Sequence, residues 1–346
     1  MRLTDLRYLL AYLVPACVAT GLALRGPWVW LTPLFVFGLV PLLELLFPPH
    51  AIPAAPATAG APHHPFFDGL LYLNVPLYLG LLAWFLAVLA REPLTAAEAT
   101  GLIVSVGIAG GALGINVAHE LGHRPRTYEQ RLAQALLASV LYLHFFIEHN
   151  RGHHRHVATP LDPATSRLHE PFWQFLPRAL AGEFRSAWHL ETERLQRSGV
   201  ATSWSWQNQL LRFQAVQLAL AVAVGLGFGW KGLLAWLGVA LVAAVLFQLV
   251  NYVEHYGLLR RQTASGAYER VQPHHSWNSE HAVGRILLYE LTRHSDHHYL
   301  ASRPYHTLRH QPASPQMPTG YPGMMLLAAV PPLWFRVMNP RVPEPA

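Results

Sequence analysis

Histidine is the residue type whose spacing in this sequence points most directly to chemistry. The chain has 21 histidines, and nine of them fall in four short segments. In the first segment His119 and His123 stand four residues apart, which places both imidazoles on one face of a helix. The other three segments contain His149, His153 and His154; then His255; then His294, His297 and His298.

The spacing inside the later segments repeats the first pattern. His149 and His153 are again four residues apart, with His154 adjacent. His294 stands three residues before His297 and four before His298, so it too can share a helix face with a second imidazole. A pair of this kind is common in proteins, whereas four such segments in one chain indicate a metal centre.

Nine imidazoles are more than one metal ion can bind. A structural zinc ion takes four protein ligands and a catalytic one takes three. Nine ligands therefore suit two ions with four or five ligands each. Imidazole binds zinc, copper, iron and nickel alike, so the ligand type does not choose the metal. The remaining histidines show no comparable pairing, and we expect them at the surface or around the site.

Each of the four segments also carries a carboxylate next to a histidine. These acids are Glu120, Glu148, Glu254 and Asp296. Neutral imidazoles leave the charge of a bound metal uncompensated. A nearby carboxylate can offset part of that charge and can orient a ring through its free N–H. We expect this supporting role for all four acids.

The first segment also matches a different motif. His119-Glu120-Leu121-Gly122-His123 has the form H-E-x-x-H, the signature of zinc metalloproteases. Such an enzyme needs one further ligand, which leaves most of the other seven histidines without a role. Carboxylate-bridged di-iron bundles use a Glu-x-x-His motif from each of two helices and a Glu from each of two others, a full pattern absent here, and a haem–thiolate centre needs a ligating cysteine. The sole cysteine, Cys17, lies on a different element from the histidines.

The composition indicates that membrane helices position these segments. Of the 346 residues 52% are hydrophobic and 13% are charged, against about 25% charged in a typical soluble domain. A membrane span needs about 20 apolar residues. The sequence predicts an all-α integral membrane protein, a single membrane domain over residues 1–346. It has six spans in three hairpins: residues 8–24 and 28–47, 70–90 and 97–118, and 210–230 and 233–253.

The apolar segment 132–147 needs separate treatment. It is too short for a comfortable span, and it contains Gln134 and His144. If it crossed the membrane, the histidines on its two sides would lie on opposite faces. We therefore predict a re-entrant or interfacial helix. Residues 148–209 and 254–346 then form a histidine-rich cap, and a proline-rich link covers residues 48–68.

Charge predicts the orientation of this arrangement. The three turns on the side away from the histidines carry Arg25, Arg91 and Lys231, while the other 22 of the 25 Lys and Arg residues fall on the histidine side. The positive-inside rule makes that side cytoplasmic, together with both termini. A basic face would attract an acidic carrier protein, and no nucleic-acid partner is expected. Because one cysteine cannot hold an iron–sulfur or rubredoxin-type centre, electrons must come from another molecule.

The four motifs together resemble those of the membrane-bound alkane 1-monooxygenases, or alkane ω-hydroxylases. The histidine boxes alone are shared with the wider superfamily of membrane fatty-acid desaturases and hydroxylases. The segment Asn251-Tyr252-Val253-Glu254-His255-Tyr256-Gly257 is narrower, being typical of alkane hydroxylases and the related xylene monooxygenases. The resemblance continues through residues 268–279 and 334–342, and it covers most of the chain beyond about residue 70.

This resemblance implies a specific activity. Members of the alkane 1-monooxygenase family are six-span proteins of the inner membrane with a non-haem di-iron site. By this resemblance, all nine histidines named above match the family's metal ligands. They use O2 and two electrons to hydroxylate the terminal methyl group of medium-chain n-alkanes, which reach the site from the bilayer. Electrons come from rubredoxin, which is reduced by an NAD(P)H-dependent rubredoxin reductase.

Three other functions stay open at this point. A hydroxylase of methyl groups on aromatic rings would have the same di-iron core and a pocket of different shape. The segment Asn251–Gly257 disfavours an acyl-lipid desaturase. A histidine-rich metal transporter would need polar residues along its spans, and here they gather at the ends of the spans.

Overall fold

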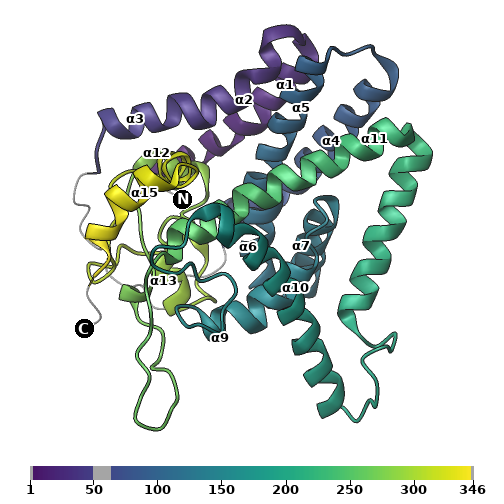
Figure 1. The fold of residues 1–346 in the computed structure, drawn as a ribbon. Helices are drawn as coiled ribbons and strands as arrows, with labels where there is room; N and C mark the ends of the chain where they lie inside the picture. The colour runs from purple at the N-terminus through teal and green to yellow at the C-terminus, as the bar shows by residue number, and fades with distance from the viewer. Residues whose placement is uncertain (1–2, 50–63, 344–346) are drawn as a thin grey trace.

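The computed structural model describes residues 3–49 and 64–343, and these residues are almost entirely helical or irregular (Figure 1). Most of the predicted proline-rich link, residues 50–63, lies outside the described residues. In the described part of the chain, β-structure is limited to the isolated bridges Gln262↔Tyr268 and Asn278↔Gln316. The predicted all-α class is confirmed.

Five helices are long and apolar enough to cross a membrane, among the residues the structure describes. The first comprises η1 (Leu3–Tyr12) and α1 (Leu13–Leu24), and the second comprises η2 (Gly26–Trp30), α2 (Leu31–Leu34), η3 (Phe35–Leu39) and α3 (Val40–Leu46). The third is α4 (Pro65–Arg91), and the fourth comprises α5 (Ala96–Ala109), η4 (Gly110–Ile115) and α6 (Asn116–Gly122). The fifth is α11 (Gln209–His255).

Helix α11 contains both of the last two predicted spans. Its 47 residues are interrupted at Gly229, whose φ of 70° and ψ of −178° lie far from helical values. Glycine adopts positive φ without the steric cost that a Cβ imposes. Figure 1 shows the result, two arms of α11 that meet at a sharp bend. The last two predicted spans correspond to these two arms, which join at Gly229 without an intervening loop and count together as one of the five long apolar helices.

The three turns predicted to share one side lie near one another. Arg25 forms an ion pair with Glu92 at 3.0 Å, which joins the first turn to the second. Arg91 and Glu92 also line a surface hollow together with Lys231. Ala96 begins the fourth helix beside these turns, and His119 follows 23 residues later, which corresponds to about 35 Å along a helix. The turns and the histidines therefore lie at opposite ends of the long helices.

The cap consists of short helices that surround the histidine end. Before α11 they are α7 (Thr127–Ser139), α8 (His144–Glu148), η5 (His149–His153), α9 (His154–His156) and the longer α10 (Phe172–Arg197). After α11 they are η6 (Pro273–His275), α12 (Ala282–Leu287), α13 (His294–Tyr299), η7 (Tyr305–Thr307), α14 (Tyr321–Ala328), α15 (Pro331–Met338) and η8 (Asn339–Arg341). The start of the chain also lies against the cap, since the Tyr8 hydroxyl donates a hydrogen bond to Glu290 at 2.6 Å.

The segment 132–147, predicted as one helix, is divided in two. Helix α7 ends at Ser139, Leu141 has a φ of 56°, and α8 begins at His144. This break turns the chain back on itself after α7. It thereby brings the histidines that follow α8 to the same end of the fold as His119 and His123.

Candidate metal centre

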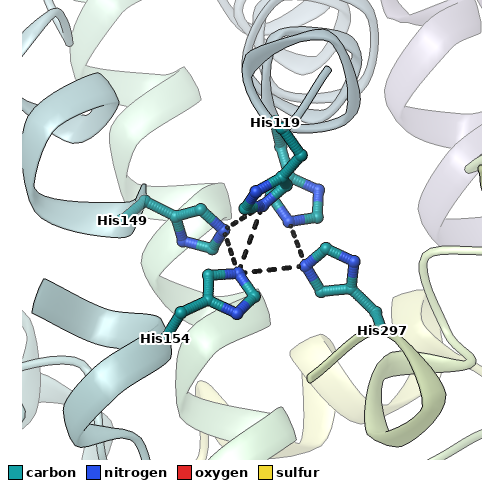
Figure 2. Close-up of side chains that lie close together, drawn as sticks. His119, His149, His154 and His297 are labelled. Atoms are coloured by element: carbon teal, nitrogen blue, oxygen red, sulfur yellow. Dashed lines mark hydrogen bonds between the residues drawn. The ribbon is translucent and has the colours of Figure 1, made fainter. Parts of the chain in front are cut away.

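The structure brings all nine of the predicted histidines together. Their ring nitrogens form two groups, and within each group the candidate ligand atoms lie within 4.8 Å of one another. The five-histidine group consists of His119, His123, His149, His154 and His297. The four-histidine group consists of His153, His255, His294 and His298. Figure 2 labels four members of the larger group, whose rings converge from three separate parts of the chain.

The spacing of the ring nitrogens fits a shared metal ion. In the five-histidine group the Nε2–Nε2 distances are 2.9 Å for His119 to His297 and 3.0 Å for both His123 and His154 to His149. A neutral imidazole has only one N–H, so one nitrogen cannot serve several such neighbours as a set of ordinary hydrogen bonds. Nitrogens about 2.1 Å from one ion and about 90° apart are about 3.0 Å from each other.

The four-histidine group has the same spacing. Its Nε2–Nε2 distances are 2.8 Å for His294 to His298, 3.2 Å for His255 to His294 and 3.2 Å for His153 to His298. The two groups are adjacent, since the ring centres of His154 and His298 are 4.6 Å apart. The two sets of candidate donor atoms therefore lie next to each other.

Adjacent histidines in the sequence serve different groups. His153 belongs to one group and His154 to the other, and His298 and His297 divide in the same way. This arrangement explains why two of the segments contain a His-His pair. The expected pairing of His149 with His153 is wrong, because η5 is a π-helix in which the His154 N–H bonds to the carbonyl of His149. Residues five apart share a face in such a turn, so His149 joins His154.

Burial favours the neutral form of several of these imidazoles. Burial, reinforced by the neighbouring imidazoles, lowers the pKa of His149, His154, His297 and His298 well below the usual 6.5. Neutral imidazole is the form that binds a metal. These four side chains can therefore bind a cation without first losing a proton.

A carboxylate that the sequence does not single out supports the four-histidine group. Asp162 lies 3.0 Å from Nδ1 of His153 and accepts a hydrogen bond from the Thr165 hydroxyl at 2.6 Å. Burial alone would raise the pKa of Asp162, but His153 and the Thr165 hydroxyl lower it overall. Asp162 thus holds the His153 ring with Nε2 directed at the metal position. It lies nine residues from His153 on an irregular loop, where no periodic spacing reveals it.

Replacement of Asp162 by asparagine tests this support. The amide keeps the shape of the side chain but removes the negative charge that orients His153. We expect the affinity of the four-histidine group for its metal to fall about 10- to 100-fold. Metal retained per chain after dialysis against a chelator measures the effect. The ion of the five-histidine group is an internal control, and equal loss of both ions would contradict this role.

The four predicted supporting acids have different surroundings. Glu120 pairs with Arg124 at 3.2 Å and accepts a hydrogen bond from the backbone N–H of Tyr305. Asp296 pairs with Arg303 and accepts a hydrogen bond from the backbone N–H of Arg309. These two carboxylates thus hold the cap segment that contains Tyr305 and Arg309.

Glu148 and Glu254 have different contacts from those of Glu120 and Asp296. Glu148 accepts a hydrogen bond from the Ser186 hydroxyl at 3.2 Å, and burial with the charges of Asp162 and Glu183 raises its pKa well above the usual value. Glu254 lies against His294. Among the four acids, Glu254 is therefore the one whose carboxylate contacts a histidine of either group in the described chain.

The segment 251–257 also fixes the cap to α11. The Tyr252 hydroxyl donates to the carbonyl of Glu170 at 2.6 Å, and the Tyr256 hydroxyl donates to Asn339 at 2.6 Å. Both rings pack against Trp334, with centres 5.1 and 5.2 Å apart. Because His255 lies between these tyrosines, the packing that holds the cap also positions this ligand.

An apolar pocket leads to the histidines from among the candidate membrane helices. Its walls include Val14, Val36, Ile108, Leu246 and Phe247, which come from the first, second, fourth and fifth long helices. Its other end is lined by His119 and His149 of the five-histidine group and by His294 of the four-histidine group. A long apolar molecule in this pocket would meet both groups.

Comparison with known proteins identifies the family of this chain. The profile of the fatty acid desaturase family matches residues 93–327. Alkane 1-monooxygenase 2 of Pseudomonas aeruginosa is 44% identical over 320 residues, which cover 91% of this chain and 84% of that protein. The alkane 1-monooxygenase of Ectopseudomonas oleovorans is 41% identical over 353 residues, which cover 97% of this chain and 84% of that protein.

A third relative is more distant. The hydroxylase component of a xylene/toluene monooxygenase from Pseudomonas putida is 30% identical over 340 residues, which cover 96% of this chain and 87% of that protein. The identity to the alkane 1-monooxygenases is higher over similar lengths. The chain therefore belongs to the fatty acid desaturase family and, within it, to the alkane 1-monooxygenases.

Proposed function

We propose that this protein hydroxylates the terminal methyl group of medium-chain n-alkanes to give 1-alkanols, using O2 and electrons from rubredoxin. One observation carries the proposal: the apolar pocket ends at His119, His149 and His294, so it reaches both histidine groups. The relatives named alkane 1-monooxygenase support the choice of substrate.

The two groups would hold two iron ions. The five-histidine group would bind one ion and the four-histidine group the other, and their Nε2 spacings fit such coordination. When bound, the iron pair supplies the redox chemistry that activates O2 for attack on an unactivated C–H bond. The metal choice rests on the family, since imidazole alone accepts several metals.

The protein's own contribution is to hold the chain end and to exclude water. Leu246 and Phe247 give the pocket an apolar wall, which suits an alkane without polar groups. Two amides at the histidine end turn toward the protein: the Asn116 amide donates to the carbonyl of Leu288, and the Asn251 amide donates to Glu183. The pocket thus orients a methyl group toward the histidines without hydrogen bonds to the substrate.

We further propose a multi-pass protein of the inner membrane with six crossings. The bend at Gly229 would let α11 cross twice, and the histidine cap and both termini would face the cytoplasm. The excess of Lys and Arg on the histidine side supports this orientation. The same basic face would receive the acidic carrier rubredoxin, which a rubredoxin reductase reduces with NAD(P)H.

An assay with the purified protein tests the function. Rubredoxin, its reductase and NADH are supplied with octane or with xylene, and the products are identified. We expect 1-octanol as the main product, formed faster than the alcohol from xylene. Faster xylene oxidation would favour the aromatic alternative. The absence of oxygen consumption with one zinc ion per chain would overturn the proposal.

A substitution within the pocket tests the path of the alkane. Ala112 lines the pocket, and a phenylalanine there would fill space that an octane chain needs. We expect Ala112→Phe to lower octane oxidation at least about tenfold, the cost of a misplaced chain end, with the metal content unchanged. Ala223→Phe, on an exposed face of α11, is the matched control. Equal octane oxidation by both variants would place the substrate elsewhere.

A further inference from the structure

Glu254 is anchored beside the four-histidine group by one of its two oxygens. The side chain lies one residue before His255 at the end of α11 and is 1% exposed. Its Oε1 accepts a hydrogen bond from the Tyr321 hydroxyl at 2.7 Å. In the described part of the chain no lysine or arginine forms an ion pair with it, and Oε2 approaches His294. A buried carboxylate without a basic partner is costly unless a cation lies near it.

The other oxygen lies on the metal side of the histidines. Oε2 of Glu254 is 3.2 Å from Nε2 of His294, the same nitrogen that faces His255 at 3.2 Å and His298 at 2.8 Å. This distance matches the spacing between ligands of one ion. A carboxylate that only orients a ring binds the opposite nitrogen, as Asp162 does at Nδ1 of His153.

The Nδ1 atom of His294 confirms which side of the ring Glu254 occupies. This nitrogen is buried and has no hydrogen-bond partner among the residues described. Glu254 therefore does not hold the ring through its free N–H, which is the role that the sequence predicts. Glu254 also lines the apolar pocket, as does His294.

The number of candidate ligands in each histidine group is consistent with Glu254 as a further ligand. One group offers five imidazoles and the other offers four, and both include histidines of the second and fourth segments. Glu254 would bring the smaller group to five donors. A carboxylate would also offset the charge of an ion that four neutral imidazoles leave uncompensated.

We infer that Glu254 is a direct ligand, through Oε2, of the metal ion held by the four-histidine group. The inference rests on the proposed di-iron site. It gives the two irons different donor sets, five imidazoles at one and four imidazoles with a carboxylate at the other.

Mössbauer spectra and iron content of the purified protein test the inference without relying on turnover. The variants are Glu254→Gln, which keeps the shape of the side chain, and Glu254→Ala. Glu148→Gln is the matched control, because Glu148 also directly precedes a candidate ligand and is 2% exposed but contacts Ser186. Thermal unfolding of each variant verifies that it is folded.

We expect Glu254→Gln to change the quadrupole doublet of one iron and to leave the other unchanged. Glu254→Ala should release one iron at a chelator concentration at least about tenfold lower than wild type requires. Glu148→Gln should match wild type in both measurements. Unchanged doublets and chelator resistance in a folded Glu254→Gln variant would overturn the inference. A wild-type protein without two irons would instead overturn the proposed function, so the two failures are distinguishable.

Discussion

We expect the His255→Ala variant to retain about one iron ion per chain and to form no measurable 1-octanol. His255 is fully buried in the four-histidine group, and its Nε2 faces His294 at 3.2 Å. Its removal leaves three imidazoles for that ion and opens the site to water. Because the proposed oxidation needs both ions, loss of one should abolish it rather than slow it. Iron analysis and the octane assay measure the two effects separately.

The control for this variant is another buried histidine. His144 lies close in sequence to the second histidine segment and is buried, but it belongs to neither group. His144→Ala should retain both irons. If His255→Ala retained full activity, His255 would have to be removed from the ligand set. If His144→Ala lost iron as readily, the loss would reflect general destabilisation of the cap.

Replacement of Arg124 by methionine should have the largest effect on stability. Arg124 is 4% exposed, and its guanidinium pairs with Asp68, with Glu129 at 2.9 Å and with Glu120 at 3.2 Å. Methionine retains the apolar stem but leaves buried carboxylates without the cation that they share. Removal of one partner from a buried ion pair costs about 3–5 kcal/mol.

The location of Arg124 links this stability to the metal centre. It follows His123 directly and ties the end of α6 to α4 and α7. We therefore expect a lower midpoint of thermal unfolding and less iron per purified chain. Arg126→Met is the control, since Arg126 is exposed and its side chain donates a hydrogen bond to the Tyr128 hydroxyl. Equal midpoints for the two variants would show that the buried cluster contributes little.

The sequence predicts the histidine cluster well because its signal is local. Residues four apart on a helix share a face, so His119 with His123 and His294 with His298 can be paired by counting. The assignment of His149 cannot be obtained in this way. It depends on the π-helical turn of η5, which places the ring nitrogen of His149 in the same group as that of His154 and not with that of His153. Whether residues 149–153 form an α-helix or a π-helix depends on how they pack in the fold, and the spacing of residues in the sequence does not predict it.

The supporting groups were harder to predict because they come from distant or irregular segments. Asp162 lies on a loop without periodic spacing, and it meets His153 only after the chain folds back. Glu254 is adjacent to a candidate ligand in sequence, yet which ring nitrogen it approaches depends on α13, 40 residues later. Apolar length predicts the long helices, and the segments predicted at residues 210–230 and 233–253 correspond to the two arms of α11 that meet at Gly229.

Iron analysis of the wild-type protein, combined with its Mössbauer spectrum, tests the central claim most directly. The claim is that nine histidines in two unequal groups hold two iron ions at the end of an apolar pocket. The account predicts about two irons per chain and two quadrupole doublets of equal area, one for each donor set. One metal ion per chain, or zinc in place of iron, would contradict it.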